Sequence, residues 1–488
     1  MVDTHTVKYS ASISTPNQTD RCQKTRELEQ ALVTLVQFEG LLGADEKFSL
    51  LDRMAHYKIP GVSMALIESG EIAWAKTWGV KNAEQQTDLS PDTLFQAASI
   101  SKKVAAFAAL QLVEAGDLRL DKPINQYLKC WQLPENDLTR QQPVTLAQLL
   151  SHTAGTTVHG FRGYAQSEVQ PSAIQILEGN ESAVSDPVMV DTLPGTQFRY
   201  SGGGTTVVQM AMEDVTGKPF SQILHEQVLQ PSGMTRSTFE NPLPETFQQD
   251  VACGHLAGGQ LVPDKWHNYP MQAAASLWCT PSDLVKFSLA VLRSCLGEED
   301  ALLSKTLCDQ YLSEHKNVWG LGPRLFIQNG KTIGFHHGGA NEGYRCNSVT
   351  FLDGRGAVVM TNSDQGDALL GEIMATLATL YDWPECQPKE QKWRPLSADD
   401  QAQLTGVFTL MHEDEAYEAH VSYQDQELDI RCPIITLTNP FYYIEQNGDN
   451  WVAMNSSGAK VQFSINDQGE SVVMIFGNTF IRQESVKK

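Results

Sequence analysis

The sequence has little that would suit a membrane or a nucleic acid. Its first twenty residues hold no apolar signal-peptide core, and no uncharged apolar run approaches the roughly 18 residues of a membrane span. Basic residues are few: 36 lysines and arginines stand against 58 acidic residues, a formal net charge of −22. A field of that sign repels phosphate backbones and anionic lipids. We therefore expect a globular, cytoplasmic protein with no nucleic-acid or membrane partner.

Paired cysteines and several common enzyme signatures are also lacking. The nine cysteines are odd in number, widely scattered and never arranged as CxxC, which argues against a disulfide framework or a zinc site. We interpret them as small buried apolar residues. No GxSxG, HExxH, P-loop or GxGxxG motif lies in a supporting context, so α/β-hydrolase, zinc-protease and nucleotide-binding hypotheses have no starting point.

Length and pattern together indicate two or three folded units. A chain of 488 residues exceeds what one core of roughly 100 to 200 residues usually holds. A proline-rich stretch marks a linker, and after it short alternating runs separated by turn residues predict a small antiparallel barrel. The predicted units are an N-terminal arm and helix (1–57), a main domain (58–382) with a helical insertion (about 121–300), the linker (383–397) and a C-terminal β-barrel (398–488).

Within the main domain the apolar pattern predicts an α+β fold. Two strands across 61–80 are joined by a hairpin at Ser69-Gly70, and 100–116 is apolar all round, as in a buried helix. Strands return over 331–362, and a closing helix follows. Helical spacing over 26–57 predicts one or two further surface helices ahead of this domain.

One serine stands at the start of that buried helix. A serine three residues before a lysine is a known nucleophile pattern, and it occurs at Ser99, Ser313, Ser457 and Ser485. Only Ser99 opens the buried helix, where Lys102 lies one turn away on the same face. A helix N-terminus supplies backbone N–H groups and a positive dipole that stabilise an oxyanion. The alternative is an ordinary N-cap serine followed by a solvated lysine.

Further motifs follow Ser99 in order: LLSHTAG at 149–155, YSG at 200–202 and FHHGGANEGY at 335–344. With them the chain resembles the serine β-lactamase and penicillin-binding-protein superfamily, especially its class C-like branch of family VIII carboxylesterases and D-amino-acid peptidases. The resemblance covers residues 58 to about 380. It implies an antiparallel sheet with flanking helices and a helical insertion, followed by a lipocalin-like barrel. It also rests on IPGVS, TLFQAASISK, LRLDKPI, VTLAQLLSHTAG, PGTQFRYSGG, VTGKPF, PSGM and VVMTNSD.

Carried over by position, the resemblance implies that Ser99 is the acylated nucleophile, Lys102 its activating partner and Tyr200 their neighbour. The backbone N–H groups of Ser99 and Ala340 would form the oxyanion hole. A lysine in a dry cleft and a tyrosine beside a cation are both able to take the serine proton, so the identity of the base stays open. The resemblance implies no metal and no organic cofactor.

Two motifs depart from the β-lactamase pattern. His337-Gly338-Gly339 stand where β-lactamases carry K-T-G, and a histidine there is typical of the esterase and peptidase branch. Small residues on this strand let a substrate backbone approach closely. Gly202 replaces the asparagine of Y-x-N, which removes one hydrogen-bonding partner for an acyl-amide group. We expect these four residues to border the substrate, and the departures favour esters or small amides.

Three other residues have plainer interpretations. The resemblance implies that His152 is part of a turn that buttresses the site, and alternation along the strand places His336 on the opposite face from its neighbour, as a structural residue. Trp278 either narrows the cleft or is a core tryptophan. The plain alternatives for Tyr200 and His337 are a core aromatic residue and a solvent-facing strand histidine.

The sequence thus predicts a serine hydrolase that forms an acyl-enzyme on Ser99 and acts as a carboxylesterase on small-molecule esters. A D-aminopeptidase, another amide hydrolase or a weak β-lactamase is the alternative within the same chemistry. A different class of hypothesis keeps the fold but assigns it to binding or scaffolding. A homo-oligomer is left open. The role of the acidic barrel, with 14 acidic and 5 basic residues over 396–488, is also open.

Overall fold

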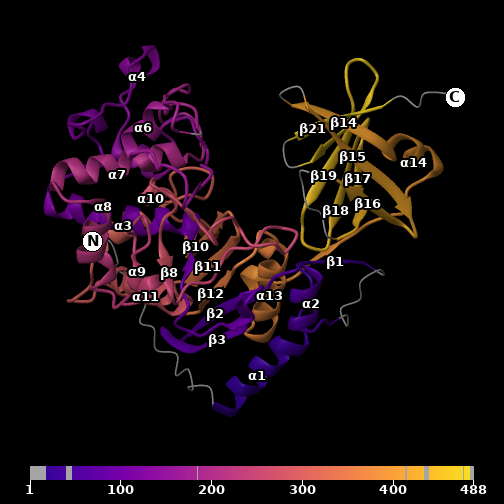
Figure 1. The fold of residues 1–488 in the computed structure, drawn as a ribbon, viewed down its shortest axis with the longest axis horizontal. Coiled ribbons are helices and arrows are strands. Elements are labelled where there is room, and N and C mark those ends of the chain that lie inside the picture. The colour runs from indigo at the N-terminus through magenta and orange to yellow at the C-terminus, as the bar shows by residue number, and fades with distance from the viewer. Residues whose placement is uncertain are drawn as a thin grey trace, which may run out of the picture.

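The computed structural model shows a two-part main body and a separate C-terminal barrel (Figure 1). Residues 1–17 of the predicted N-terminal arm lie outside the residues it describes. Within the described ranges, no helix is both long and apolar enough to cross a bilayer. The structure describes residues 18–39, 47–183, 185–412, 415–432, 439–475 and 478–483.

A seven-stranded antiparallel sheet forms the centre of the body, in the order β4-β3-β2-β12-β11-β10-β9. The predicted hairpin is confirmed, since Ser69 and Gly70 adopt φ values of 52° and 74°, as a tight two-residue turn requires. The strands are β2 (Gly61–Glu68), β3 (Glu71–Asn82), β4 (Thr87–Asp88), β9 (Arg324–Gln328), β10 (Lys331–Asn341), β11 (Tyr344–Phe351) and β12 (Gly356–Thr361).

One face of the sheet packs on α3 (Ser101–Ala115) and α11 (Pro281–Leu296). Helix α3 is buried on nearly every side, as predicted from its apolar pattern, and Phe107 meets Phe287 of α11 with ring centroids 5.6 Å apart. The helix ends at Gly116, whose φ of 87° suits a residue without a side chain. Helix α3 is therefore held by packing along most of its length.

The helical insertion lies over this face as short elements joined by long loops, as expected (Figure 1). Side-chain caps begin several of its helices; Ser201 caps α7, for example, by accepting from the Gly204 N–H. Its elements include α4 (Asp137–Gln141), α5 (Leu146–Leu150), β6 (Tyr164–Ala165), α6 (Ala173–Glu178), α7 (Gly202–Thr216), α8 (Phe220–Leu224), α9 (Glu245–Gln248), β7 (His267–Asn268), α10 (Gln272–Ala275) and β8 (Trp278–Cys279). Helix α12 (Lys305–Tyr311) follows the insertion.

The other face of the sheet packs on α1 (Gln18–Gln30), α2 (Leu50–His56) and α13 (Gly366–Leu380). The helical prediction over 26–57 is wrong in its middle. There β1 (Val36–Phe38) is a strand that pairs in parallel with β13 (Lys389–Gln391). Its alternate residues are buried against the C-terminal unit, an environment that the local apolar spacing does not reveal.

The C-terminal unit is a closed eight-stranded barrel, which confirms the predicted architecture. Large apolar residues such as Phe408 and Phe463 fill its interior. Helix α14 (Ala398–Leu404) leads into it. The strands are β14 (Gly406–His412), β15 (Glu415–Gln424), β16 (Glu427–Arg431), β17 (Phe441–Asn447), β18 (Asn450–Asn455), β19 (Lys460–Ile465), β20 (Ser471–Ile475) and β21 (Asn478–Arg482).

The N-terminal segment joins the barrel to the body. The Val36 N–H donates to the Ser456 carbonyl at 2.9 Å. Beside this contact, Tyr57 donates to the buried carboxylate of Glu372 at 2.7 Å and accepts from the Asn439 amide of the barrel at 3.0 Å. Breaking these hydrogen bonds would leave buried polar groups without partners, which is costly in free energy. The bonds therefore hold the barrel and the body in one arrangement.

Candidate active site

Ser99 lies in a tight turn, the 3₁₀ segment Ala98–Ile100, directly before α3. Ala98 adopts a φ of 49°, a left-handed conformation that costs a residue with a side chain about 1–3 kcal/mol. The neighbouring backbone holds it there: the Ala97 N–H donates to the Leu277 carbonyl at 2.8 Å, and Ser101 Oγ accepts from the Leu277 N–H at 3.0 Å. The turn is strained, and its flanking bonds keep Ser99 in one place.

Lys102 reaches back to Ser99 from the first turn of α3. Its Nζ lies 3.0 Å from Ser99 Oγ and 2.8 Å from the Ala274 carbonyl of α10, and the residue is 5% exposed. Helix α10 is held in turn by Gln209, whose Oε1 accepts from the Ala273 N–H at 3.1 Å. Sequence reasoning missed Ala274, because a backbone carbonyl leaves no signal in the side-chain pattern.

The other serine–lysine patterns are not arranged this way. Ser313 Oγ donates to the Asp309 carbonyl, while Lys316 Nζ donates to the Thr196 carbonyl at 2.6 Å. Ser457 Oγ bonds to an asparagine, at 2.7 Å, and Ser485 lies outside the described residues. Among the described copies of the pattern, only that of Ser99 joins the serine oxygen to its lysine.

Tyr200 stands beside this pair, immediately before the N-cap of α7. Lys102 Nζ lies 5.1 Å from the centroid of its ring. The ring belongs to a group that we call the aromatic wall. Sequence reasoning missed Trp319, which packs at 5.5 Å from Tyr200 and 5.3 Å from His337, because it comes from a loop without a motif. The aromatic wall consists of His152, His159, Phe198, Tyr200, Trp319 and His337.

The histidines of the aromatic wall are neutral at ordinary pH. Burial, with a further contribution from the Lys102 ammonium, lowers the pKa of His152 to about 3 and the pKa of His337 well below its usual value. His152 Nδ1 accepts from the Ser201 N–H at 3.3 Å, as a buttress of the turn would. His337 Nδ1 donates to the Gly338 carbonyl at 2.6 Å, which leaves its buried Nε2 as an acceptor without a partner among the described residues.

The glycines of β10 differ in what surrounds them. A Cβ at Gly339 would lie 2.3 Å from the Ala97 carbonyl oxygen and 2.5 Å from Cys346 Sγ, so β10 passes directly against the turn that carries Ser99. At Gly338 the nearest atom, the Cys346 carbonyl oxygen, would be 3.7 Å away. Of Gly338 and Gly339, only Gly339 is therefore sterically required for the strand to approach the serine.

Gly202 lies deeper than its predicted role suggests. It is buried at the start of α7, and its N–H donates to the His159 carbonyl at 2.9 Å. A Cβ there would lie 3.1 Å from the ring of Phe161. The loop around Phe161 therefore fills the direction that a longer side chain would take, and Gly202 does not border the cavity at Ser99.

Two other expectations concern residues near this site. Trp278 is 4% exposed and packs between Trp266 and Tyr344, each 5.8 Å away, so it is the core tryptophan of the two alternatives. His336 stacks on Phe326 at 4.6 Å. Burial lowers the pKa of His336 to about 4, and the residue also borders the cavity at Ser99.

A cavity of about 510 Å³ opens onto Ser99. Among the described residues that border it, the only carboxylate is Asp367 of α13, which bonds to Arg345 Nε at 3.1 Å. The described lining therefore has no unpaired carboxylate to offer a bound cation, and its histidines are neutral. The predicted residues on its border are Ser99, Tyr200, His337, Gly338, Gly339 and Ala340, joined by Trp319 and His159.

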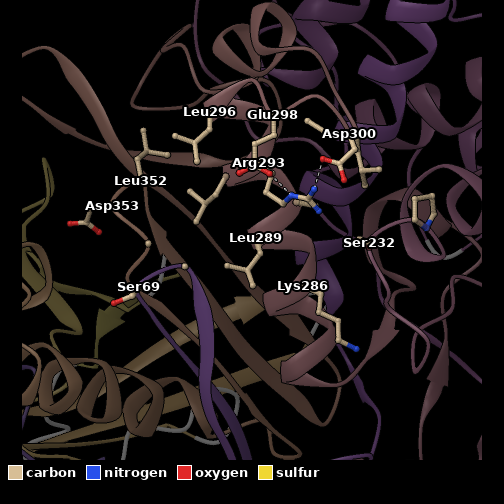
Figure 2. A pocket seen from close by; sticks show the side chains of 17 residues that line it. Ser69, Ser232, Lys286, Leu289, Arg293, Leu296, Glu298, Asp300, Leu352 and Asp353 are labelled. Atoms are coloured by element: carbon tan, nitrogen blue, oxygen red, sulfur yellow. Dashed lines mark hydrogen bonds and ion pairs between the residues drawn. The ribbon is translucent and has the colours of Figure 1, made fainter. Parts of the chain in front are cut away.

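A larger cavity, of about 700 Å³, lies near α11 and the tips of two hairpins (Figure 2). Figure 2 shows Arg293 held between Glu298 and Asp300, at 2.7 and 2.6 Å. Lys286 is engaged by Asp283 at 2.8 Å. Both of these cations, which border the larger cavity, are thus already paired with carboxylates. In the described ranges, no three His, Cys, Asp or Glu residues gather to hold a metal ion.

Comparison with known proteins identifies relatives of similar sequence and of similar fold. The chain is 26% identical over 388 residues to penicillin-binding protein 4 of Amycolatopsis lactamdurans, covering 74% of this chain and 96% of the relative. The octameric penicillin-binding protein homologue from Pyrococcus abyssi superposes with a TM-score of 0.58 at 21% identity, over 89% of this chain and 98% of that one. SurE, solved with D-Leu, superposes at 0.55 and 20% identity, over 89% and 97%. The family model described as Beta-lactamase matches residues 49–379, about two thirds of the sequence, and the chain belongs to the β-lactamase family.

Proposed function

We propose that this chain is a serine hydrolase that cleaves small esters through an acyl-enzyme on Ser99. The observation that carries the proposal is the 3.0 Å contact between Lys102 Nζ and Ser99 Oγ. A nucleophilic serine needs a base within hydrogen-bond reach, and the base needs a third group to orient it. The Ala274 carbonyl is that third group, at 2.8 Å from the same nitrogen.

The proposed reaction uses these positions. Ser99 Oγ bonds to the ester carbonyl carbon while its proton passes to the base, for which Lys102 Nζ and the Tyr200 hydroxyl oxygen, each in its deprotonated form, are the two candidates. The carbonyl oxygen becomes an oxyanion that the backbone N–H groups of Ser99 and Ala340 stabilise. The ester C–O bond then breaks, the alcohol leaves with the proton, and water releases the acid from Ser99 by the same steps.

The charge of the cavity favours esters over free amino-acid amides. A D-aminopeptidase substrate carries an ammonium group beside the scissile bond, and burying that charge without a partner costs several kcal/mol. Asp367 is already paired with Arg345, and the cation Arg324 also borders the cavity. At position 202 there is also no side-chain amide to receive an acyl-amide group, because the residue is a glycine, Gly202, that faces Phe161.

The aromatic wall indicates the kind of group that the site accommodates. Trp319 and Tyr200 border the cavity on one side of Ser99. Aromatic faces contribute contact area and prefer offset or edge-on partners. Esters with an apolar or aromatic group next to the scissile bond are therefore the expected substrates.

Labelling with a fluorophosphonate tests the nucleophile. We expect mass spectrometry to place the adduct on Ser99 in the wild type, and Ser99→Ala to abolish it. Ser313→Ala is the matched control, because it removes the same sequence pattern from a place where the serine does not contact its lysine. A folded wild type that stays unlabelled would contradict the hydrolase and favour a binding or scaffolding role.

Rates on three substrates separate the chemical classes. The proposal expects hydrolysis of nitrophenyl esters well above that of D-amino-acid anilides or a chromogenic cephalosporin. The amide alternative has support in the relative named penicillin-binding protein 4. Faster turnover of the anilide would transfer the assignment to that alternative.

Assembly is a separate proposal. The Pyrococcus abyssi homologue is described as octameric, and we propose that this chain also forms a homo-oligomer. Light scattering of the full chain tests it, and a mass near 53.9 kDa would show a monomer.

A further inference from the structure

Two cysteines that are 13 positions apart in the sequence meet in the structure. Cys295, in the last turn of α11, has its Sγ 2.7 Å from Sγ of Cys308 in α12. The sulfur atoms of a disulfide are about 2.05 Å apart, so bond formation requires an approach of only about 0.65 Å. The scattered sequence positions give no sign of this pairing.

The surrounding backbone holds the two sulfur atoms together. Gly297 ends α11 with a φ of 70°, and Ser304 caps α12. The Ser304 N–H also donates to Glu114 Oε1 of α3 at 3.1 Å. Because both helix ends are fixed and packed, the short distance does not depend on a free loop.

The two thiols differ in access. Cys308 is fully buried, and its contact with Cys295, together with burial, raises the pKa of its thiol. Cys295 is partly exposed. Since the thiolate is the reactive form and must meet the oxidant, Cys295 reacts first and Cys308 resolves.

We propose that Cys295 and Cys308 form a disulfide modification site that staples α11 to α12. Cys295 thiolate attacks a small-molecule disulfide, whose S–S bond breaks and releases one thiol. Cys308 loses its proton and attacks the mixed disulfide at Cys295, which releases the second thiol. The protein is oxidised by two electrons, and the small disulfide is reduced to two thiols.

The disulfide would stabilise a helix, α12, that packs against α3. Tyr311, in α12, donates from its hydroxyl to the Lys103 carbonyl of α3 at 2.9 Å, and its ring packs on Phe107. Cys295 also lies on α11 between Arg293 and Leu296, which border the larger cavity (Figure 2). Joining α12 to α11 therefore fixes a helix that contacts α3. The proposal does not depend on the hydrolase activity.

Oxidation of the full chain with oxidised glutathione at pH 8 tests the site. After alkylation of the remaining thiols, a non-reducing peptide map should show Cys295 linked to Cys308, with a loss of two hydrogen atoms from that pair. The exposed Cys22 and Cys130 should carry glutathione instead, which shows that the oxidant was effective. Closing a loop of this length should lower the equilibrium constant for unfolding about a hundredfold.

Two variants complete the experiment. Cys295→Ser should abolish both the cross-link and the gain in stability. Cys386→Ser, at another partly exposed cysteine, should change neither. Glutathione that remains on Cys295, a cross-link to a different cysteine, or alkylation of both thiols after oxidation would each overturn the proposal, and all are read on the wild type.

Discussion

Replacing Lys103 with methionine would remove a charge from the core without removing much volume. Lys103 follows Lys102 in α3 but is fully buried, and its Nζ donates to Ser348 Oγ at 2.7 Å. The rings of Phe287 and Phe335 lie 5.9 and 5.5 Å from the nitrogen. Burial lowers the pKa of Lys103 from 10.5 to about 7.

That shift determines how stability depends on pH. The folded pKa lies below the unfolded one, so between pH 7 and 10.5 the unfolded chain binds more protons and stability rises with pH. At pH 6 both states are charged, and the folded state bears the full penalty. Between pH 6 and pH 10 the wild type should gain about 4 kcal/mol from this residue. Lys103→Met has no such gain.

Hydrogen exchange of the α3 amides under mild urea measures this free energy within the body itself. The difference between wild type and Lys103→Met should grow in favour of the wild type from pH 6 to pH 10. Lys47→Met, at an exposed lysine, is the matched control. Its difference in unfolding free energy from the wild type should be the same at pH 6 and at pH 10. If the difference between the wild type and Lys103→Met were also independent of pH, the reasoning would be refuted.

Four further substitutions test the site and the domain contact. Gly339→Ala should lower kcat/KM on a nitrophenyl ester about a hundredfold by displacing the serine turn, whereas Gly338→Ala should change it little; equal effects would count against the steric argument. Trp319→Leu should raise KM for an aromatic ester about tenfold while fluorophosphonate labelling persists, and an unchanged KM would exclude the contact. Tyr57→Phe should destabilise the protein by about 1–3 kcal/mol, seen by thermal unfolding, because Glu372 loses a buried donor; no change in Tm would contradict this.

Local sequence patterns predicted the elements whose burial is regular along their length. The hairpin at Ser69-Gly70, the buried helix α3 and the strands of the barrel each carry their own periodicity or turn residues. Ordered motifs also predicted that Ser99 and Tyr200 meet, although they are far apart in the sequence. The structure places both on the border of one cavity.

What the sequence could not reveal depends on distant partners. Val36 lies in a strand only because residues near Lys389 and Ser456 complete its pairing. Trp319 joins the aromatic wall through the path of a loop, and Ala274 acts through a carbonyl that every residue possesses. Such contacts come from the tertiary arrangement, which no window of local sequence contains.

The pairing of β2 with β12 has a consequence for synthesis. Val62 meets Thr361, so the sheet cannot close until some 300 residues have followed β2 out of the ribosome. The pairing of Val36 with Lys389 waits longer still. During that interval the early strands expose unpaired edges, which are prone to aggregate. One edge of β2 therefore stays without its partner strand until the last third of the chain has been synthesised.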